Sequence, residues 1–352
     1  MRPLSGLATG IGSLPYTQGE EDALGLIFKY VPQIPFWPQL PKSQRPQEGM
    51  VAQFSENLPC LRQQGKDIIL DLSRQEEELE TFYGKIISAD LDYFQISKEF
   101  ARGLYAFSQR LSVEPHLLKR ANFIKCHITG PFTFAASVKD AGGKAILHNE
   151  VFLQAVIKGL AKKACWQIDF FRKFGKDIII FVDEPYLGCF GSAYTPINRQ
   201  DVVNGLAEFI AEIKSAYPKA LIGIHCCGNT DWPMLIESPI DIINFDAFGF
   251  LDKFILYADS IKAFLARKGI ICWGIVPTQD FTGRETPQSL LEMIQGGISK
   301  LVKKGLDADL LAKGLLISPA CGLGALDDEK AEKIFALLSQ TSGLLRETLC
   351  KE

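Results

Sequence analysis

Short, uninterrupted runs of apolar residues alternate with longer amphipathic segments along most of the chain. The longer segments, such as residues 149–174, 198–217 and 286–305, carry apolar positions at the spacing of one helix face. Continuous apolar runs of strand length are typical of parallel strands that are covered on both faces. The runs span residues 6–13, 66–73, 122–130, 176–184, 220–227, 240–248, 269–276 and 314–321.

Eight apolar runs that alternate with helices predict an α/β fold, namely a (β/α)8 TIM barrel. Residues 91–97 are an alternative to residues 66–73 as the second strand. No repeat or linker divides the chain, so we expect a single domain over residues 1–352. The proline-rich residues 31–46 exclude regular structure. We expect them to form a long excursion after the first strand, on the face where such a barrel carries its active site.

Composition and charge narrow the class of protein. The chain has 352 residues, is 47% hydrophobic and 22% charged, and carries a formal net charge of -3. Nucleic-acid binders usually have a basic surface, so we expect no nucleic-acid partner. No signal peptide is recognisable and no apolar run approaches the roughly 18 residues that cross a bilayer. The sequence therefore predicts a soluble, cytoplasmic protein without a membrane partner.

Polar side chains follow several of the predicted strands where each strand ends. The carboxyl ends of barrel strands meet at one mouth, where the chemistry of such folds lies. A carboxylate, imidazole or thiol buried there is costly unless it is paired or binds a metal. The residues in question are Ser13, Thr129, Asp183, Glu184, His225, Cys227, Asp246 and Cys321.

The fifth run ends in the sequence His225-Cys226-Cys227. Side chains at i and i+2 of a strand share a face, so His225 and Cys227 point one way and Cys226 the other. Cys321, at another strand end, supplies a third ligand, and Asp246 supplies a fourth ligand or a partner behind the ligands. Imidazole and thiolates together favour zinc.

The spacing of these ligands favours a catalytic zinc site over a structural one. Structural zinc knuckles take their ligand pairs from tight local loops, whereas these residues lie on distant strands. Two thiolates cancel the charge of Zn²⁺, which then suits the activation of a thiol better than the polarisation of a carbonyl. Alkyl transfer to sulfur follows as the expected chemistry. Alcohol dehydrogenation is disfavoured because no G-x-G-x-x-G motif occurs.

Five motifs in order resemble the catalytic barrel of cobalamin-independent methionine synthase and the related zinc methyltransferases of the uroporphyrinogen decarboxylase-like group. They extend over nearly the whole chain. The fourth is closest to the His-x-Cys-Gly-Asn form of corrinoid-dependent methyltransferases. The motifs are ATGIGSLPYT (8–17), HITGPFTF (127–134), FVDEP (181–185), IHCCGNTDW (224–232) and ISPACGLGAL (317–326).

The resemblance implies zinc on His225, Cys227 and Cys321, with Asp246 where the synthases place a glutamate ligand. It also implies that Ser13 and Asp183 hold the amino-acid part of homocysteine, because a carboxylate pairs with a substrate ammonium through a charge-assisted bond. The alternative for Asp183 is a strand-end acid that caps the next helix.

Two further residues complete the candidate site. Asp183 is a candidate catalytic residue as well, and Glu184, next to it, is a further candidate for substrate binding. His127 lies two residues before Thr129 on the same predicted strand and is a candidate catalytic residue that faces the same interior.

The sequence departs from the synthases in ways that bear on the methyl donor. It resembles only their C-terminal half, without the part that helps to bind folate. Gln44 stands where the family places a second carboxylate for the substrate amine, and the loop after residues 272–278 carries no histidine. These departures favour a methylcorrinoid as donor. No D-x-H-x-x-G motif is present, so the corrinoid would be held by a partner protein.

Three functions remain open at this stage. The first is a zinc methyltransferase that acts on a small thiol, homocysteine before coenzyme M. The second is a metal-free uroporphyrinogen decarboxylase-like enzyme, which needs an arginine cluster, whereas the N-terminal segment offers only Arg2 and Arg45. The third is a non-catalytic, metal- or corrinoid-responsive accessory protein.

Overall fold

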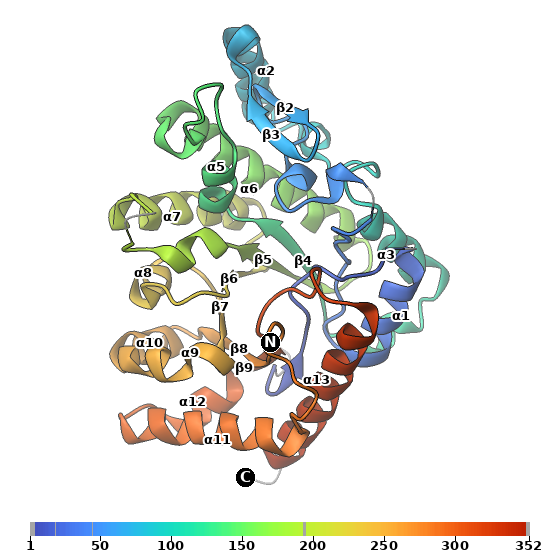
Figure 1. Cartoon of the computed structure of the whole chain (residues 1–352), viewed down its shortest axis with the longest axis vertical. Coiled ribbons are helices and arrows are strands. Elements are labelled where there is room, and N and C mark those ends of the chain that lie inside the picture. The colour runs from blue at the N-terminus through green and yellow to red at the C-terminus, as the bar shows by residue number, and fades with distance from the viewer. Residues whose placement is uncertain (1–3, 18, 44, 193–194, 350–352) are drawn as a thin grey trace.

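Seven parallel strands form one curled sheet, a half-barrel, in the computed structural model, which describes residues 4–17, 19–43, 45–192 and 195–349 (Figure 1). Neighbouring strands follow the order β1-β9-β8-β7-β6-β5-β4. The strands are β1 (Leu7–Ala8), β4 (Phe123–Thr129), β5 (Asp177–Asp183), β6 (Leu221–Cys226), β7 (Ile242–Asp246), β8 (Ile270–Val276) and β9 (Leu315–Pro319).

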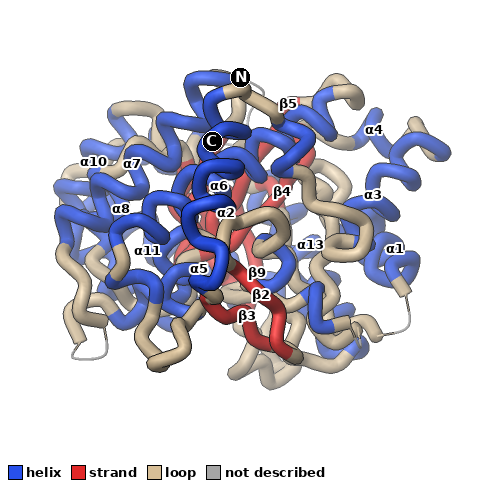
Figure 2. The backbone as a smooth tube through the Cα atoms, turned by 90° about the horizontal axis from the view of Figure 1, so that it is seen from above, coloured by secondary structure: helices blue, strands red, loops and turns tan. Residues whose placement is uncertain are grey.

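Helices surround the sheet, and the view from above shows the strands at the centre with helices outside them (Figure 2). The amphipathic segments expected to be helical are confirmed as α6, α7 and α11. The helices are α1 (Glu20–Tyr30), α2 (Gln75–Ile87), α3 (Arg102–Val113), α4 (Leu117–Arg120), α5 (Pro131–Ser137), α6 (Glu150–Arg172), α7 (Arg199–Ala216), α8 (Trp232–Glu237), α9 (Ala247–Phe254), α10 (Ala258–Ala266), α11 (Pro287–Lys303), α12 (Ala308–Lys313) and α13 (Asp328–Leu349).

The expected second barrel strand is wrong. Residues 66–73 contain β3 (Asp67–Leu70), but β3 pairs with β2 (Leu61–Gln64) in a separate antiparallel hairpin. Gly65 adopts a left-handed conformation (φ 64°) between the two strands, so a tight turn joins β3 to its immediate neighbour in the sequence. The alternative strand at residues 91–97 is also wrong, because its first part is a 3-10 helix (Leu91–Phe94).

The proline-rich segment lies between the two edges of the parallel sheet. On one side, the amide of Lys125 in β4 donates to the carbonyl of Pro35 at 2.9 Å; on the other, the amide of Gln39 donates to the carbonyl of Gly12 at 3.0 Å. Prolines remove backbone donors, which explains why these contacts do not extend into a strand. The irregular conformation expected of the segment is confirmed, whereas a closed eight-stranded barrel is not.

Side chains alternate between the two faces of the sheet, as the period of a strand requires. One face packs against the helices, for example through Ile124, Ile128 and Ile180. The other face forms a separate inner cluster: Leu4, Leu7, Ile34, Phe123, Ile179, Phe181, Leu221, Ile242, Ile270, Cys272 and Leu316. These inner apolar residues stop before the carboxyl ends of the strands, so the polar residues of the site lie above them.

The described helices include none that combines the length and apolar character needed to cross a membrane.

Candidate metal centre

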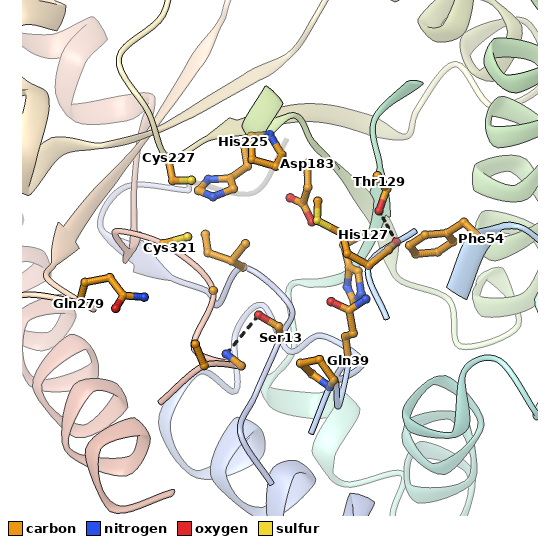
Figure 3. A pocket seen from close by; sticks show the side chains of 17 residues that line it. Ser13, Gln39, Phe54, His127, Thr129, Asp183, His225, Cys227, Gln279 and Cys321 are labelled. Atoms are coloured by element: carbon orange, nitrogen blue, oxygen red, sulfur yellow. Dashed lines mark hydrogen bonds between the residues drawn. The ribbon is translucent and has the colours of Figure 1, made fainter. Parts of the chain in front are cut away.

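A cavity of about 330 Å³ opens at the carboxyl ends of the strands (Figure 3). Its wall combines the ends of β4, β5 and β6 with the segments that follow β1 and β9 and with part of the proline-rich segment. The apolar part of the wall includes Ile11, Pro41, Met50, Phe54 and Pro185. The polar side chains that line it are Ser13, Gln39, His127, Thr129, Asp183, His225, Cys227, Gln279 and Cys321.

Three of these side chains form a group that can hold one metal ion. One potential ligand atom from each of His225, Cys227 and Cys321 lies within 4.8 Å of the other two. Tetrahedral zinc with bonds of about 2.0–2.3 Å sets its ligand atoms roughly 3.3–3.8 Å apart. Small side-chain movements therefore suffice to close the group on an ion, and the soft thiolates together with an imidazole fit zinc.

The alternation along β6 separates the two adjacent cysteines. Cys227 lines the cavity with His225, whereas Cys226 is fully buried in the core that packs against the helices. Gly228 then approaches Gly188 so closely that a Cβ at Gly228 would lie 2.7 Å from the Cα of Gly188. Glycine is required at this crossing, which holds the segment that follows Cys227 in place.

Asn244 of β7 fixes which nitrogen of His225 faces the two thiols. Its amide nitrogen donates to the Cys272 carbonyl and to the Ser318 hydroxyl, both at 2.9 Å. The Cys272 carbonyl can only accept, so the side-chain nitrogen of Asn244 must point toward it. The side-chain oxygen of Asn244 then faces the Nδ1 of His225, 2.5 Å away, and accepts a hydrogen bond from it. Nε2 of His225 is then the nitrogen that faces the thiols and that can bind a metal.

We expect the substitution Asn244→Leu to weaken zinc binding by roughly 10–100-fold, as is usual when the partner behind a metal-ligating histidine is lost. Ser318→Ala, which removes only one of the two acceptors of the Asn244 amide, is the matched control and should change the affinity much less. Competition with a chromogenic chelator measures both. Equal affinities for Asn244→Leu and the unaltered protein would refute this role of Asn244.

Without a metal, the thiols of Cys227 and Cys321 have pKa values shifted in opposite directions. Hydrogen bonds with Cys321 and His225 outweigh burial and lower the pKa of Cys227. The hydrogen bond with Cys227 and burial raise the pKa of Cys321. Binding of a metal to both sulfurs would therefore release the proton of Cys321.

Asp246, the expected fourth ligand, lies outside the group of three. Its carboxylate caps α9 by accepting the Gly249 amide at 2.8 Å, and burial raises its pKa. An aspartate directly before a helix commonly takes this role, because the first amides of a helix lack partners within it. We therefore leave Asp246 out of the ligand set.

Asp183 and Glu184 are adjacent in the sequence, but their carboxylates lie in different surroundings. Asp183, at the end of β5, lines the cavity, and its Oδ1 is buried with no partner among the described residues. Burial raises the pKa of Asp183 to about 6.

Glu184 points instead to the first turn of α5. Its carboxylate accepts the amides of Phe132 at 3.0 Å and Thr133 at 2.8 Å, and the hydroxyl of Thr133 at 2.6 Å. These bonds make Glu184 a support of the fold, so we leave it out of the substrate-binding set.

The remaining predicted residues reach the cavity. Ser13 lines it, and its hydroxyl accepts the Gly324 amide at 3.3 Å. Thr129 lines it too and donates to the carbonyl of Met50 at 2.6 Å. His127 is fully buried in the wall, and neither ring nitrogen has a partner among the described residues.

The structure is similar to those of B12-independent methionine synthases. One comparison is with the enzyme from Shewanella sp. W3-18-1 in complex with selenomethionine, at 20% identity and a TM-score of 0.47, covering 69% of this chain and 68% of that one. Another is with a protein from Listeria monocytogenes assigned as a vitamin-B12-independent methionine synthase, at 14% identity and a TM-score of 0.49, covering 96% of each chain.

A third, more distant likeness is to the catalytic domain of the major endoglucanase from Xanthomonas campestris pv. campestris, at 12% identity and a TM-score of 0.28, covering 67% of this chain and 88% of that one. The sequence matches no model of a known family and no curated protein. We therefore base the functional proposal on the geometry of the site itself.

Three polar residues of the site, Asn244, Gln39 and Gln279, are absent from the sequence-based prediction. Asn244 is hidden inside an apolar run, although its place two residues before Asp246 puts it on the inner face. Gln39 lines the cavity from the proline-rich segment. Gln44, the predicted counterpart of a second carboxylate, and Arg2 lie outside the described residues. Arg45 pairs with Glu20 at 3.2 Å and does not line the cavity.

The charge of the cavity is simple. Among the described residues that line it, Asp183 is the only carboxylate and there is no lysine or arginine. Lys125, buried in the sheet interior, donates to the carbonyl of Ile11 and does not reach the wall. Apart from the three candidate metal ligands, the described lining of the cavity therefore offers one negative charge and no positive side chain.

Proposed function

We propose that the protein is a zinc-dependent methyltransferase that transfers a methyl group to the sulfur of a small thiol, with homocysteine as the first candidate. The observation that carries the proposal is the convergence of His225, Cys227 and Cys321 on one wall of a cavity that also holds the unpartnered carboxylate of Asp183.

His225, Cys227 and Cys321 would hold the zinc. Zinc with two thiolates and one imidazole is neutral, and it binds a further thiol as thiolate while leaving the sulfur electron-rich. Three protein ligands leave one tetrahedral position for this sulfur. Asn244 keeps His225 in the tautomer that the site needs.

Asp183 would bind the amino group of the acceptor. A buried carboxylate with an unpartnered oxygen is stabilised by a charge-assisted bond to an ammonium. The apolar walls, including Ile11, Met50 and Phe54, exclude water and keep this bond strong. With the amino group held by Asp183 and the sulfur at the metal ligands, the acceptor is fixed at both ends.

The same cavity disfavours the other acceptors. Coenzyme M has no ammonium to pair with Asp183, and neither its sulfonate nor the many carboxylates of a porphyrinogen would meet a lysine or arginine among the described residues that line the cavity. A cavity of about 330 Å³ also suits a small thiol better than a tetrapyrrole. The uroporphyrinogen decarboxylase-like function thus has no observation in its favour.

The donor we propose is a methylcorrinoid presented by a partner protein at the mouth of the cavity. In such a transfer the carbon–cobalt bond breaks and its electron pair stays on cobalt, which gives cob(I)alamin. The methyl group forms the new bond to sulfur, and the thiol proton passes to solvent. Atoms and charge balance without any oxidant or reductant.

Incubation of the zinc-loaded protein with methylcobalamin and a series of thiols tests the function. We expect methionine from homocysteine, with loss of the methylcobalamin absorbance, and much slower reaction with coenzyme M. Absence of methyl transfer to every thiol, despite one bound zinc per chain, would refute the enzyme and favour the accessory role.

A further inference from the structure

The end of the cavity remote from the metal ligands contains a histidine in a tight slot (Figure 3). The ring of His127 stacks on the indole of Trp37, with ring centres 3.8 Å apart and an angle of 28°. Phe54 meets it edge-on at 6.3 Å. A Cβ added to Gly12 would lie 2.9 Å from the Nδ1 of His127, so the backbone of Gly12 also packs closely against this ring.

A glutamine of helix α6 binds both Trp37 and the backbone of His127. The indole nitrogen of Trp37 donates to the Oε1 of Gln167 at 2.9 Å, and the Nε2 of Gln167 donates to the carbonyl of His127 at 3.1 Å. Gln167 is fully buried and thus ties the stacking partner and the backbone of His127 to one side chain. These contacts fix the plane of the imidazole against Trp37.

The fold nevertheless leaves both ring nitrogens of His127 unused. Each is buried with no hydrogen-bond partner among the described residues, while the residue lines the cavity. Buried polar atoms are nearly always paired in folded proteins, and an orphan of this kind at a site points to a ligand. Burial lowers the pKa of His127, so the ring is neutral and one nitrogen is an acceptor.

Gln39 presents a second neutral acceptor to the same end of the cavity. The carbonyl of Phe100 accepts from the Nε2 of Gln53 at 3.0 Å, so the oxygen of Gln53 faces Gln39. The Nε2 of Gln39 donates to that oxygen at 2.8 Å. The Oε1 of Gln39 is left over, and no described residue donates to it.

We propose that His127, with Gln39, is a specificity-determining residue that binds the amino group of the thiol substrate next to Asp183. The inference rests on the proposed function and deepens it. An ammonium has three N–H donors, and the cavity wall along β4, β5 and the proline-rich segment supplies three acceptors that the fold leaves free: Asp183 Oδ1, Gln39 Oε1 and one nitrogen of His127. Of these acceptors only Asp183 is charged, and its single negative charge balances the single positive charge of the ammonium.

Binding of three thiols to the zinc-loaded protein, without any methyl donor, tests this inference. The probes are homocysteine, 3-mercaptopropylamine, which lacks only the carboxylate, and 4-mercaptobutanoate, which lacks only the amino group. His127→Phe keeps an aromatic ring in the slot and removes both nitrogens. We expect this change to weaken binding of the two amines about 10-fold, the usual value of one hydrogen bond, and to leave 4-mercaptobutanoate unchanged.

Two controls make the result specific. Gln39→Leu should show the same selective loss, whereas Phe54→Leu, a change in the apolar wall, should affect all three probes alike. An equal loss for all probes in His127→Phe, or no loss for any, would overturn the proposal.

Should His127→Phe fail to fold, the ¹⁵N signals of the His127 ring in the unaltered protein decide. We expect them to shift with 3-mercaptopropylamine and not with 4-mercaptobutanoate; the same response to both would overturn the proposal. Methyl transfer plays no part in these measurements. Discrimination between the probes without transfer would refute the proposed reaction alone, and transfer without discrimination would refute this inference alone.

Discussion

The substitution Cys321→Ser is expected to abolish stoichiometric zinc binding. It removes one of only three ligands, and a serine hydroxyl does not replace a thiolate for zinc at neutral pH. The loss of affinity should exceed about 100-fold, the upper end of what the loss of a partner behind a ligand costs. Metal analysis after gel filtration, together with chelator competition, measures it, and methyl transfer should fall to the level of a blank.

Cys226→Ala is the matched control for this experiment. Cys226 is adjacent to the ligand Cys227 but belongs to the core on the other side of the sheet. We expect one zinc per chain in this variant and a loss of about 1 kcal/mol in the free energy of unfolding, from the removed sulfur contact. Full zinc content in Cys321→Ser, or its loss in Cys226→Ala, would contradict the assignment of the ligands.

The second large effect is expected for Asp183→Asn, which should bind zinc normally but use homocysteine poorly. Loss of a charge-assisted bond to the substrate ammonium should lower kcat/KM for homocysteine by roughly 10–100-fold. At the same time the variant should be more stable at pH 7, because it no longer buries an unpaired charge.

The direction of this stability change follows from the pKa. Burial raises the pKa of Asp183 from 3.8 to about 6 in the folded protein, so the folded state holds the proton more tightly than the unfolded state does. The stability that Asp183 contributes is therefore complete below its ordinary pKa and is lost as the pH rises through about 6. Asp183→Asn should gain up to about 3 kcal/mol at pH 7 and almost nothing near pH 3.5. Denaturant titration of the metal-free proteins at both pH values measures the difference.

Glu184→Gln is the control for Asp183→Asn. Its carboxylate binds the first turn of α5 and does not face the substrate, so this change should leave the preference for amino-bearing thiols intact. A loss of stability at pH 7 in Asp183→Asn, with an unchanged kcat/KM, would remove Asp183 from the substrate site.

The sequence is sufficient to predict the grouping of His225, Cys227 and Cys321, the three candidate metal ligands. His225 and Cys227 are two residues apart at the end of an apolar run, and the period of a strand puts them on one face. Cys321 follows another such run, and the parallel arrangement brings both ends to the same edge of the sheet. Only local periodicity and one rule of topology are needed.

Asp246 and Glu184 show where such reasoning stops. Both follow strands, as Asp183 does, but a helix begins directly after Asp246, and α5 begins beside Glu184 from a distant part of the sequence. The carboxylate of an acid at a strand end can bind a ligand, or it can accept the free amides at the start of a helix. Which of the two it does depends on the direction of its side chain, which a single sequence does not specify. For Asp246 the helix that follows was the available signal.

The segment that lies between the two edge strands, β4 and β1, was harder to predict from the sequence. The prolines around Gln39 correctly indicate an irregular segment, but they hide that it lies beside β4 and carries a side chain into the cavity. For the hairpin of β2 and β3 the error was the reverse: β3 has the apolar character of a strand of the main sheet, so it was predicted to belong to that sheet although it lies outside it. Pairing partners, which decide both cases, are set by tertiary packing.

X-ray absorption at the zinc edge, with and without homocysteine, tests most directly whether three side chains hold one ion and leave a position for a substrate sulfur. The expected spectrum of the zinc-loaded protein has two sulfur neighbours at about 2.3 Å and one imidazole nitrogen at about 2.0–2.1 Å. Homocysteine should raise the number of sulfur neighbours to three. A sulfur count that stays at two with saturating homocysteine, or a first shell without two sulfurs, would contradict the proposed centre.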